Sequence, residues 1–172
     1  MSSAAMNIED ELLYSAKDGI GHIVLNRPHR RNAMTFGMYD RIKEICARAG
    51  TADDPDGLKV LIFSGGGDAA FAAGTDISQF RTFTSKDAIN YEAMIDEVLT
   101  TIESCRVPTI AALNGFCTGG GAAIAAASFS AERSCLCRSA FSCDDSSCSF
   151  CNAARSRLFC SCSEALSASP EP

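Results

Sequence analysis

Residues 107–127 read VPTIAALNGFCTGGGAAIAAA: a short apolar run, a break, three consecutive glycines and an alanine-rich segment. The run at 109–113 predicts a buried strand, which the Asn-Gly pair at 114–115 ends. The glycines at 119–121 predict a tight turn into a helix that begins near Ala122. Such a turn leaves backbone N–H groups without helical partners beside the positive end of the helix, and together they can hold an oxyanion. The alternative is a buried crossover whose glycines only permit close packing.

Two further stretches carry recognisable patterns. Residues 26–34 read NRPHRRNAM, and residues 70–77 read AFAAGTDI after an apolar run and a glycine loop. With the glycine triplet, they follow the patterns N-R-P-x-x-x-N-A, A-F-x-A-G-x-D-[LI] and N-G-x-x-x-G-G-G. In this order and at these separations the chain resembles the enoyl-CoA hydratase/isomerase (crotonase) superfamily. The resemblance covers roughly residues 10–127.

The order of elements predicts an α/β fold. Residues 12–17 and 20–26 flank Asp18-Gly19 and predict a β-hairpin. Helical spacing of apolar residues follows the predicted caps Thr35 and Ser85. Residues 58–63, like 109–113, form an apolar run typical of a strand buried on both faces. The resemblance implies a crotonase-like spiral of ββα units, here truncated after the start of the oxyanion-hole helix.

The composition changes at residue 128. All 13 glycines precede this point, and serine and cysteine dominate the residues that follow. We therefore predict two domains: an incomplete crotonase-like acyl-CoA-binding domain at 1–127, and a weakly packed Ser/Cys-rich tail outside the family at 128–172. An out-of-frame or aberrantly spliced origin would account for such a tail.

The tail also raises the question of a metal site. It contains seven of the ten cysteines, from Cys135 to Cys162, but no paired CxxC motif, and no histidine lies beyond His29. Structural zinc sites usually take their ligands from two such closely spaced Cys or His pairs, so we predict no metal. A structural or metal-binding role for the tail remains an alternative.

Charge and the N-terminal sequence narrow the function classes. The net charge is −6 and the isoelectric point is near 4.9, which argues against nucleic acid as a partner. The first residues lack the basic and apolar regions of a signal peptide. No apolar run is long enough to span a bilayer, so we expect no membrane partner and a cytoplasmic location.

The resemblance implies a specific chemistry. Members of the superfamily bind acyl-CoA thioesters, and two backbone N–H groups hold the thioester oxygen as it becomes an enolate. Carried over by position, these catalytic donors are Thr75 and Gly120. No cofactor is expected beyond the coenzyme A that forms part of the substrate.

Contacts to coenzyme A are also implied by position. Arg27 and His29 belong to a basic loop at 27–31, where phosphate and pantetheine contacts are expected, although a solvated loop is the plain alternative. The main chain of Ala73, Thr75 and Ile77 corresponds to the edge that meets the adenine. Asp76 lies within this motif, and we expect its side chain to be structural.

The acid/base groups of a hydratase are missing. Family hydratases use two glutamates, and the first of these positions is Ala123 here. The second falls in the tail, where Glu132 and Asp144 are the nearest acids and match no known role.

From the resemblance, the predicted function is an enoyl-CoA hydratase/isomerase-like enzyme. The alternative is a catalytically impaired coenzyme A-binding fragment or pseudoenzyme. The family usually forms homotrimers or hexamers, but the short fold predicts an exposed apolar patch and aggregation.

Overall fold

The computed structural model of the chain describes residues 8–129. Its helices are α1 (Ile8–Glu11), α2 (Phe36–Arg48), α3 (Ser85–Glu103) and α4 (Gly120–Ala127), with short 3-10 helices η1 (Pro28–Arg30) and η2 (Ile77–Phe80). Its strands are β1 (Leu12–Lys17), β2 (Ile20–Leu25), β3 (Val60–Gly65), β4 (Ala70–Ala72), β5 (Thr109–Ala112) and β6 (Phe116–Cys117). Among these described helices, none has the length and apolar character needed to cross a membrane.

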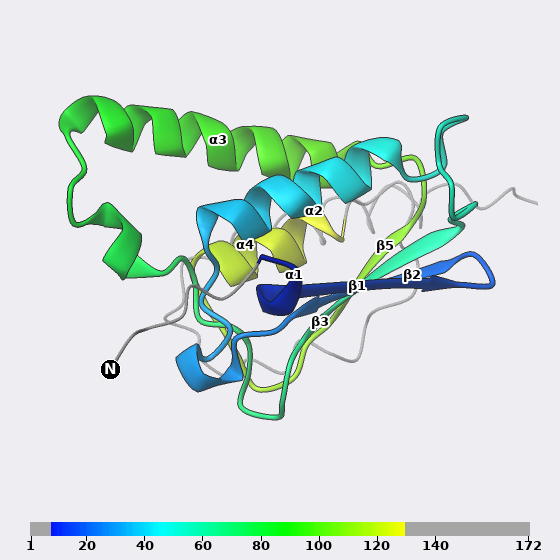
Figure 1. The fold of residues 1–172 in the computed structure, drawn as a ribbon, viewed down its shortest axis with the longest axis horizontal. Coiled ribbons are helices and arrows are strands. Elements are labelled where there is room, and N and C mark those ends of the chain that lie inside the picture. The colour runs from blue at the N-terminus through cyan, green and yellow to red at the C-terminus, as the bar shows by residue number, and fades with distance from the viewer. Residues whose placement is uncertain (1–7, 130–172) are drawn as a thin grey trace, which may run out of the picture. The chain divides into compact units, whose positions relative to one another are not determined.

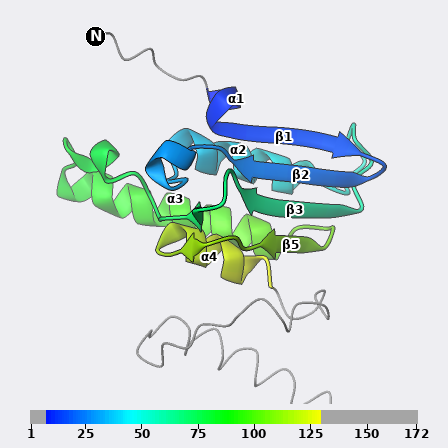
Figure 2. The same cartoon turned by 90° about the horizontal axis from the view of Figure 1, so that it is seen from below.

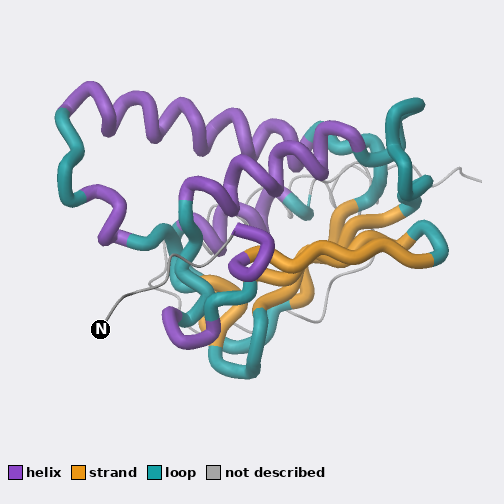
Figure 3. The backbone as a smooth tube through the Cα atoms, viewed as in Figure 1, coloured by secondary structure: helices purple, strands orange, loops and turns teal. Residues whose placement is uncertain are grey.

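Four strands form the main sheet in the order β1-β2-β3-β5. β1 and β2 are antiparallel across Asp18-Gly19, which confirms the predicted hairpin. β2, β3 and β5 are parallel, with Ile20 opposite Val60 and Ile62 opposite Ile110. Because parallel strands end at one edge of a sheet, the loops that follow β2, β3 and β5 lie together there (Figure 3).

The helices cover one face of this sheet. Figures 1 and 2 show α2, α3 and α4 on the same side of the strands. On that side Leu61 and Phe63 of β3 are fully buried, whereas Val60 and Ile62, which alternate with them, are only partly buried. In β5 the alternation is clearer, because Ile110 is 41% exposed. The expectation of strands buried on both faces is therefore wrong for β5, since the helices cover only one face.

Helix caps explain where the helices begin. α2 starts after Thr35, as predicted, and Gly50 follows its end with a φ of +68°. α3 is capped by Thr84 and not by Ser85, because Thr84 accepts a hydrogen bond from the Asp87 N–H. The Asp87 carboxylate in turn accepts hydrogen bonds from the Thr84 N–H at 2.9 Å and its hydroxyl at 2.7 Å. The cap prediction for α3 was wrong by one residue.

Several predictions fall outside the described residues. They concern the tail from residue 130 onward, including Glu132, Asp144 and the cysteines from Cys135 to Cys162. The proposed boundary at 127/128 is likewise untested, and it remains a prediction.

Candidate active site

Two glycine turns meet beside a small second sheet. β4 and β6 pair in parallel, which sets the turn after β4 against the turn before α4. Gly74 and Gly119 have φ values of +93° and +53°, in the region that glycine adopts without strain. A Cβ on Gly119 would lie 3.4 Å from the Gly74 Cα, and a Cβ on Gly74 would lie 3.8 Å from the Gly120 nitrogen. Glycine is suited to both turns because their positive φ values would strain most other residues.

The two predicted donors lie at this junction. No residue in the described range 8–129 accepts a hydrogen bond from the backbone N–H of Thr75 or of Gly120. Gly120 is also the first residue of α4, where the helix dipole contributes partial positive charge. Two free N–H groups on adjacent turns at a helix start can stabilise a negatively charged oxygen.

The Thr75 segment is fixed by its neighbours. The Met34 N–H donates to the Gly74 carbonyl at 2.8 Å, and the Asp76 N–H donates to the Met34 carbonyl at 2.8 Å. These two bonds bracket Thr75 and hold its peptide against the start of α2. Backbone hydrogen bonds of the residues before and after Thr75 thus hold the Thr75 N–H in place.

The Thr75 side chain joins a chain of hydroxyl groups. Its oxygen shares hydrogen bonds with the Tyr39 hydroxyl at 2.8 Å and the Tyr91 hydroxyl at 2.7 Å. Tyr39 is 1% exposed, and burial raises the pKa of its hydroxyl well above the ordinary value, so it stays protonated. These hydroxyl contacts could not be recognised from the sequence, because both tyrosines occupy apolar positions of helical patterns.

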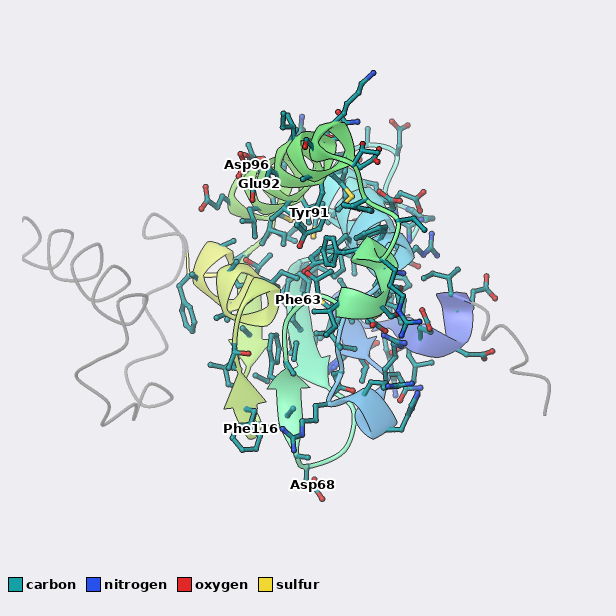
Figure 4. All side chains as sticks on the ribbon, turned by 90° about the vertical axis from the view of Figure 1, so that its left-hand side faces the viewer. Phe63, Asp68, Tyr91, Glu92, Asp96 and Phe116 are labelled. Atoms are coloured by element: carbon teal, nitrogen blue, oxygen red, sulfur yellow. The ribbon has the colours of Figure 1, made fainter. Side chains whose placement is uncertain are left out.

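An apolar pocket opens at the Tyr91 end of the hydroxyl chain. It has a volume of about 230 Å³, and its lining residues come from the start of α2, the loop after η2 and α3: Phe36, Phe83, Asp87, Asn90, Tyr91 and Met94. Phe80 packs edge-on against Tyr91 with ring centroids 4.8 Å apart. Figure 4 shows Tyr91 on the sheet-facing side of α3, with Glu92 and Asp96 on its flank. Through the Tyr91 hydroxyl, this apolar space is connected to the side chain of Thr75.

Arg27 and Asp76 form the structural support of the site. The Arg27 guanidinium lies 3.1 Å from the Glu11 carboxylate and 2.9 Å from the Asp76 carboxylate, and it donates to the Ala33 carbonyl at 2.5 Å. Asp76 also caps η2 by accepting from the Ser78 N–H at 3.0 Å. The bonds from Ser78, together with Arg27, lower the pKa of Asp76 to about 2. Arg27 is thus buried among protein partners, and the Asp76 carboxylate contacts both Arg27 and Ser78.

The remaining predicted coenzyme A contacts are more accessible. His29 and Arg31 are exposed, and the Arg31 guanidinium lies 5.5 Å from the centre of the exposed Phe116 ring, which Figure 4 labels. The Arg31 carbonyl accepts a hydrogen bond from the Ala73 N–H at 3.0 Å, which ties the basic loop to the Thr75 segment. Ile77 is 83% exposed. The structure therefore brings the basic loop and residues 73–77 to one edge.

Ala123 occupies the first turn of α4, near the donors. It is partly buried, and its N–H donates to the Gly119 carbonyl at 3.0 Å. Its methyl group can neither accept nor deliver a proton. The side chain at position 123 therefore cannot act as a general acid or base.

Comparison with known proteins identifies the family. The family model for enoyl-CoA hydratase/isomerase matches residues 15–129, and the chain belongs to this family. Crotonyl-CoA hydratase of Syntrophomonas wolfei is 32% identical over 116 residues, which are 67% of this chain and 44% of that protein. Short-chain-enoyl-CoA hydratase of Clostridium acetobutylicum is 31% identical over 110 residues, or 63% and 41% of the two chains.

Solved structures agree on the fold. An enoyl-CoA hydratase/isomerase family protein from Hyphomonas neptunium superposes with a TM-score of 0.63 at 36% identity, over 71% of this chain and 46% of that one. The predicted crotonase fold and family are confirmed. The chain spans less than half the length of these relatives.

Proposed function

We propose that this chain acts on acyl-CoA thioesters, as an enoyl-CoA hydratase/isomerase-like protein, through an enolate held by the backbone N–H groups of Thr75 and Gly120. One observation carries the proposal. Within the described residues both N–H groups lack an acceptor, and they lie on turns whose backbones are in contact. Membership of the enoyl-CoA hydratase/isomerase family supports the substrate class.

The expected mechanism follows from charge. When a proton leaves the carbon next to a thioester, or a nucleophile adds to the conjugated double bond, negative charge moves onto the carbonyl oxygen. Fixed donors that point at this oxygen stabilise the charge without reorganising, and each is typically worth roughly 10²–10³-fold in rate. The apolar pocket lined by Phe36 and Tyr91 would hold the acyl part beside the donors.

Coenzyme A would lie along the edge formed by the basic loop and residues 73–77. His29, with the neighbouring exposed arginines, would meet the phosphates, and the main chain of Ala73, Thr75 and Ile77 would meet the adenine. Arg27 and Asp76 would support this edge through their mutual ion pair rather than touch the ligand. The coenzyme A arrives with the substrate, and we propose no other cofactor.

Ala123 favours a second candidate function. A general acid or base typically contributes roughly 10²–10⁴-fold to a rate, and Ala123 supplies neither. The second candidate is therefore a coenzyme A-binding protein with impaired turnover. Both candidates share the oxyanion site and differ only in turnover.

Two measurements test the proposal. Calorimetry with acetyl-CoA on the full chain should show binding, and a folded sample that gives no heat would contradict the whole proposal. Hydration of crotonyl-CoA, followed at the enoyl absorbance, then separates the two candidates. Turnover several orders of magnitude below that of a complete relative would favour the impaired form. A cytoplasmic location, and aggregation in place of the family's usual trimeric or hexameric assembly, remain predictions, and size-exclusion chromatography with light scattering tests the assembly.

A further inference from the structure

Three hydroxyl groups run in an unbranched chain beside the two amide donors. They come from Tyr39 on α2, Thr75 after β4 and Tyr91 on α3, so the chain connects two helices through the turn that carries one donor. A threonine hydroxyl has one proton and two lone pairs. With a tyrosine hydroxyl on each side of it, the Thr75 side chain is held in a single orientation.

Tyr39 also touches the second donor residue. A Cβ on Gly120 would collide with the Tyr39 hydroxyl oxygen and would lie 3.3 Å from the Thr75 hydroxyl oxygen. The buried phenol of Tyr39 therefore fills the space between the side chain of Thr75 and the backbone of Gly120. One group is in contact with both residues whose N–H groups are expected to meet the thioester oxygen.

The far end of the chain meets the space proposed for the acyl group. Tyr91 bonds to Thr75 and also lines the apolar pocket with Phe36 and Met94. A group that enters this pocket would press on the ring of Tyr91. The Tyr91 hydroxyl bonds directly to the hydroxyl of Thr75, the residue that carries one of the two N–H donors.

We propose that Tyr39 and Tyr91 are positioning residues, which through the Thr75 hydroxyl fix the direction of the Thr75 and Gly120 N–H groups toward a bound thioester oxygen. The inference rests on the proposed function of the site. In this positioning role, neither Tyr39 nor Tyr91 transfers a proton to or from the substrate. Oxyanion stabilisation depends steeply on donor geometry, because misplacement by about 1 Å can cost roughly 100-fold.

The test uses a ligand whose charge can be seen without turnover. Acetoacetyl-CoA is an acidic thioester whose enolate absorbs in the near ultraviolet, so a pH titration of the bound ligand gives its apparent pKa. With wild-type protein we expect this pKa to lie below that of the free thioester. In Tyr39→Phe and Tyr91→Phe we expect it to rise by about one unit, a tenfold loss of enolate stabilisation.

The variants separate positioning from bulk structure. Thr75→Val removes the hydroxyl at nearly constant shape and should also raise the ligand pKa, whereas Thr75→Ser should restore the low value. Tyr14→Phe is a matched control, because Tyr14 lies on β1 and donates to Asp56 at 2.6 Å instead. Thermal melts of each variant show that the fold persists. Tyr91 is only partly buried, so the ligand pKa can still be measured with Tyr91→Phe if Tyr39→Phe fails to fold.

The outcomes are distinguishable. A raised ligand pKa in folded Tyr39→Phe or Tyr91→Phe, with Tyr14→Phe unchanged, supports the inference. A ligand pKa that is low in wild type and equally low in folded Tyr91→Phe and Thr75→Val overturns it and leaves the proposed function standing. Absence of acetoacetyl-CoA binding to folded wild-type protein overturns the proposed function and this inference together.

Discussion

Gly120 leaves little room for a side chain. A Cβ there would collide with the Tyr39 hydroxyl, so Gly120→Ala forces the turn or the phenol to move. We expect a loss of about 1–3 kcal/mol in unfolding free energy, typical of overpacking, and weaker acetyl-CoA binding. Gly57→Ala is the control, because its positive φ also costs about 1–2 kcal/mol but no atom lies within 4 Å of its Cβ. Urea denaturation and calorimetry on both variants check this, and equal binding by both would contradict it.

Asp76 makes the stability depend on pH. Its pKa is about 2 in the folded chain, below the ordinary value near 3.9, so its contribution is complete above about pH 4. The contribution falls away as the pH drops from there toward 2. Asp76→Asn should therefore cost about 1 kcal/mol at neutral pH, a usual value for a capping aspartate, and less in acid. Urea midpoints of both proteins from pH 7 to 3 give the answer, and a gap that stays constant below pH 4 would count against the assignment.

At the residue scale, the motifs carried by the family resemblance point to two candidate donors, which remain a prediction, but they do not reveal the side chains around them. Motif spacing places glycines where turns must approach, and glycine has few other uses in such a pattern. Tyr39 and Tyr91 could not be recognised, because a buried tyrosine in a helical pattern has the same periodicity as a leucine. The Thr75 hydroxyl, to which both tyrosines bond, lies on a different segment of the chain.

At the scale of single elements, the residue that caps the start of α3 can be tested directly, because the sequence and the structure indicate different residues. The sequence favoured Ser85 as the cap, but the structure has Thr84 in reciprocal bonds with Asp87. Thr84→Ala should lower the unfolding free energy by about 1 kcal/mol, whereas Ser85→Ala should change it by less than about 0.5 kcal/mol. Chemical denaturation of the two variants decides between the caps. A larger loss for Ser85→Ala would restore the original prediction.

Strands and helices were otherwise predictable where their patterns are local. The β1–β2 hairpin and α2 follow from a turn dipeptide and a regular apolar stripe. An aromatic cluster, by contrast, could not be predicted, because its rings come from three separate segments and no local pattern brings them together. Its members are Phe36, Phe80, Phe83 and Tyr91.

At the scale of the whole molecule, the face of the main sheet that none of the helices in residues 8–129 covers matters most. Leu13 and Ile20 are 43% and 40% exposed, and Ile110 stands on the same face opposite Ile62. Such a surface favours self-association. We expect wild-type protein to form heterogeneous aggregates, and Ile110→Thr with Ile20→Lys to reduce them at a cost below about 1 kcal/mol in total. Size-exclusion chromatography with light scattering measures this. A discrete trimer with a cooperative transition above about 50 °C would refute it.

The meeting of the two glycine turns also has a consequence for how fast the chain folds. Gly74 and Gly119 are far apart in sequence, and their approach depends on parallel strand pairing, which closes long loops. Contacts of this kind tend to form late, after the local hairpin and helices. Substitutions at the junction should therefore act on the rate of unfolding far more than on the rate of folding. The oxyanion site would then be the last part of the domain to assemble and the first to open.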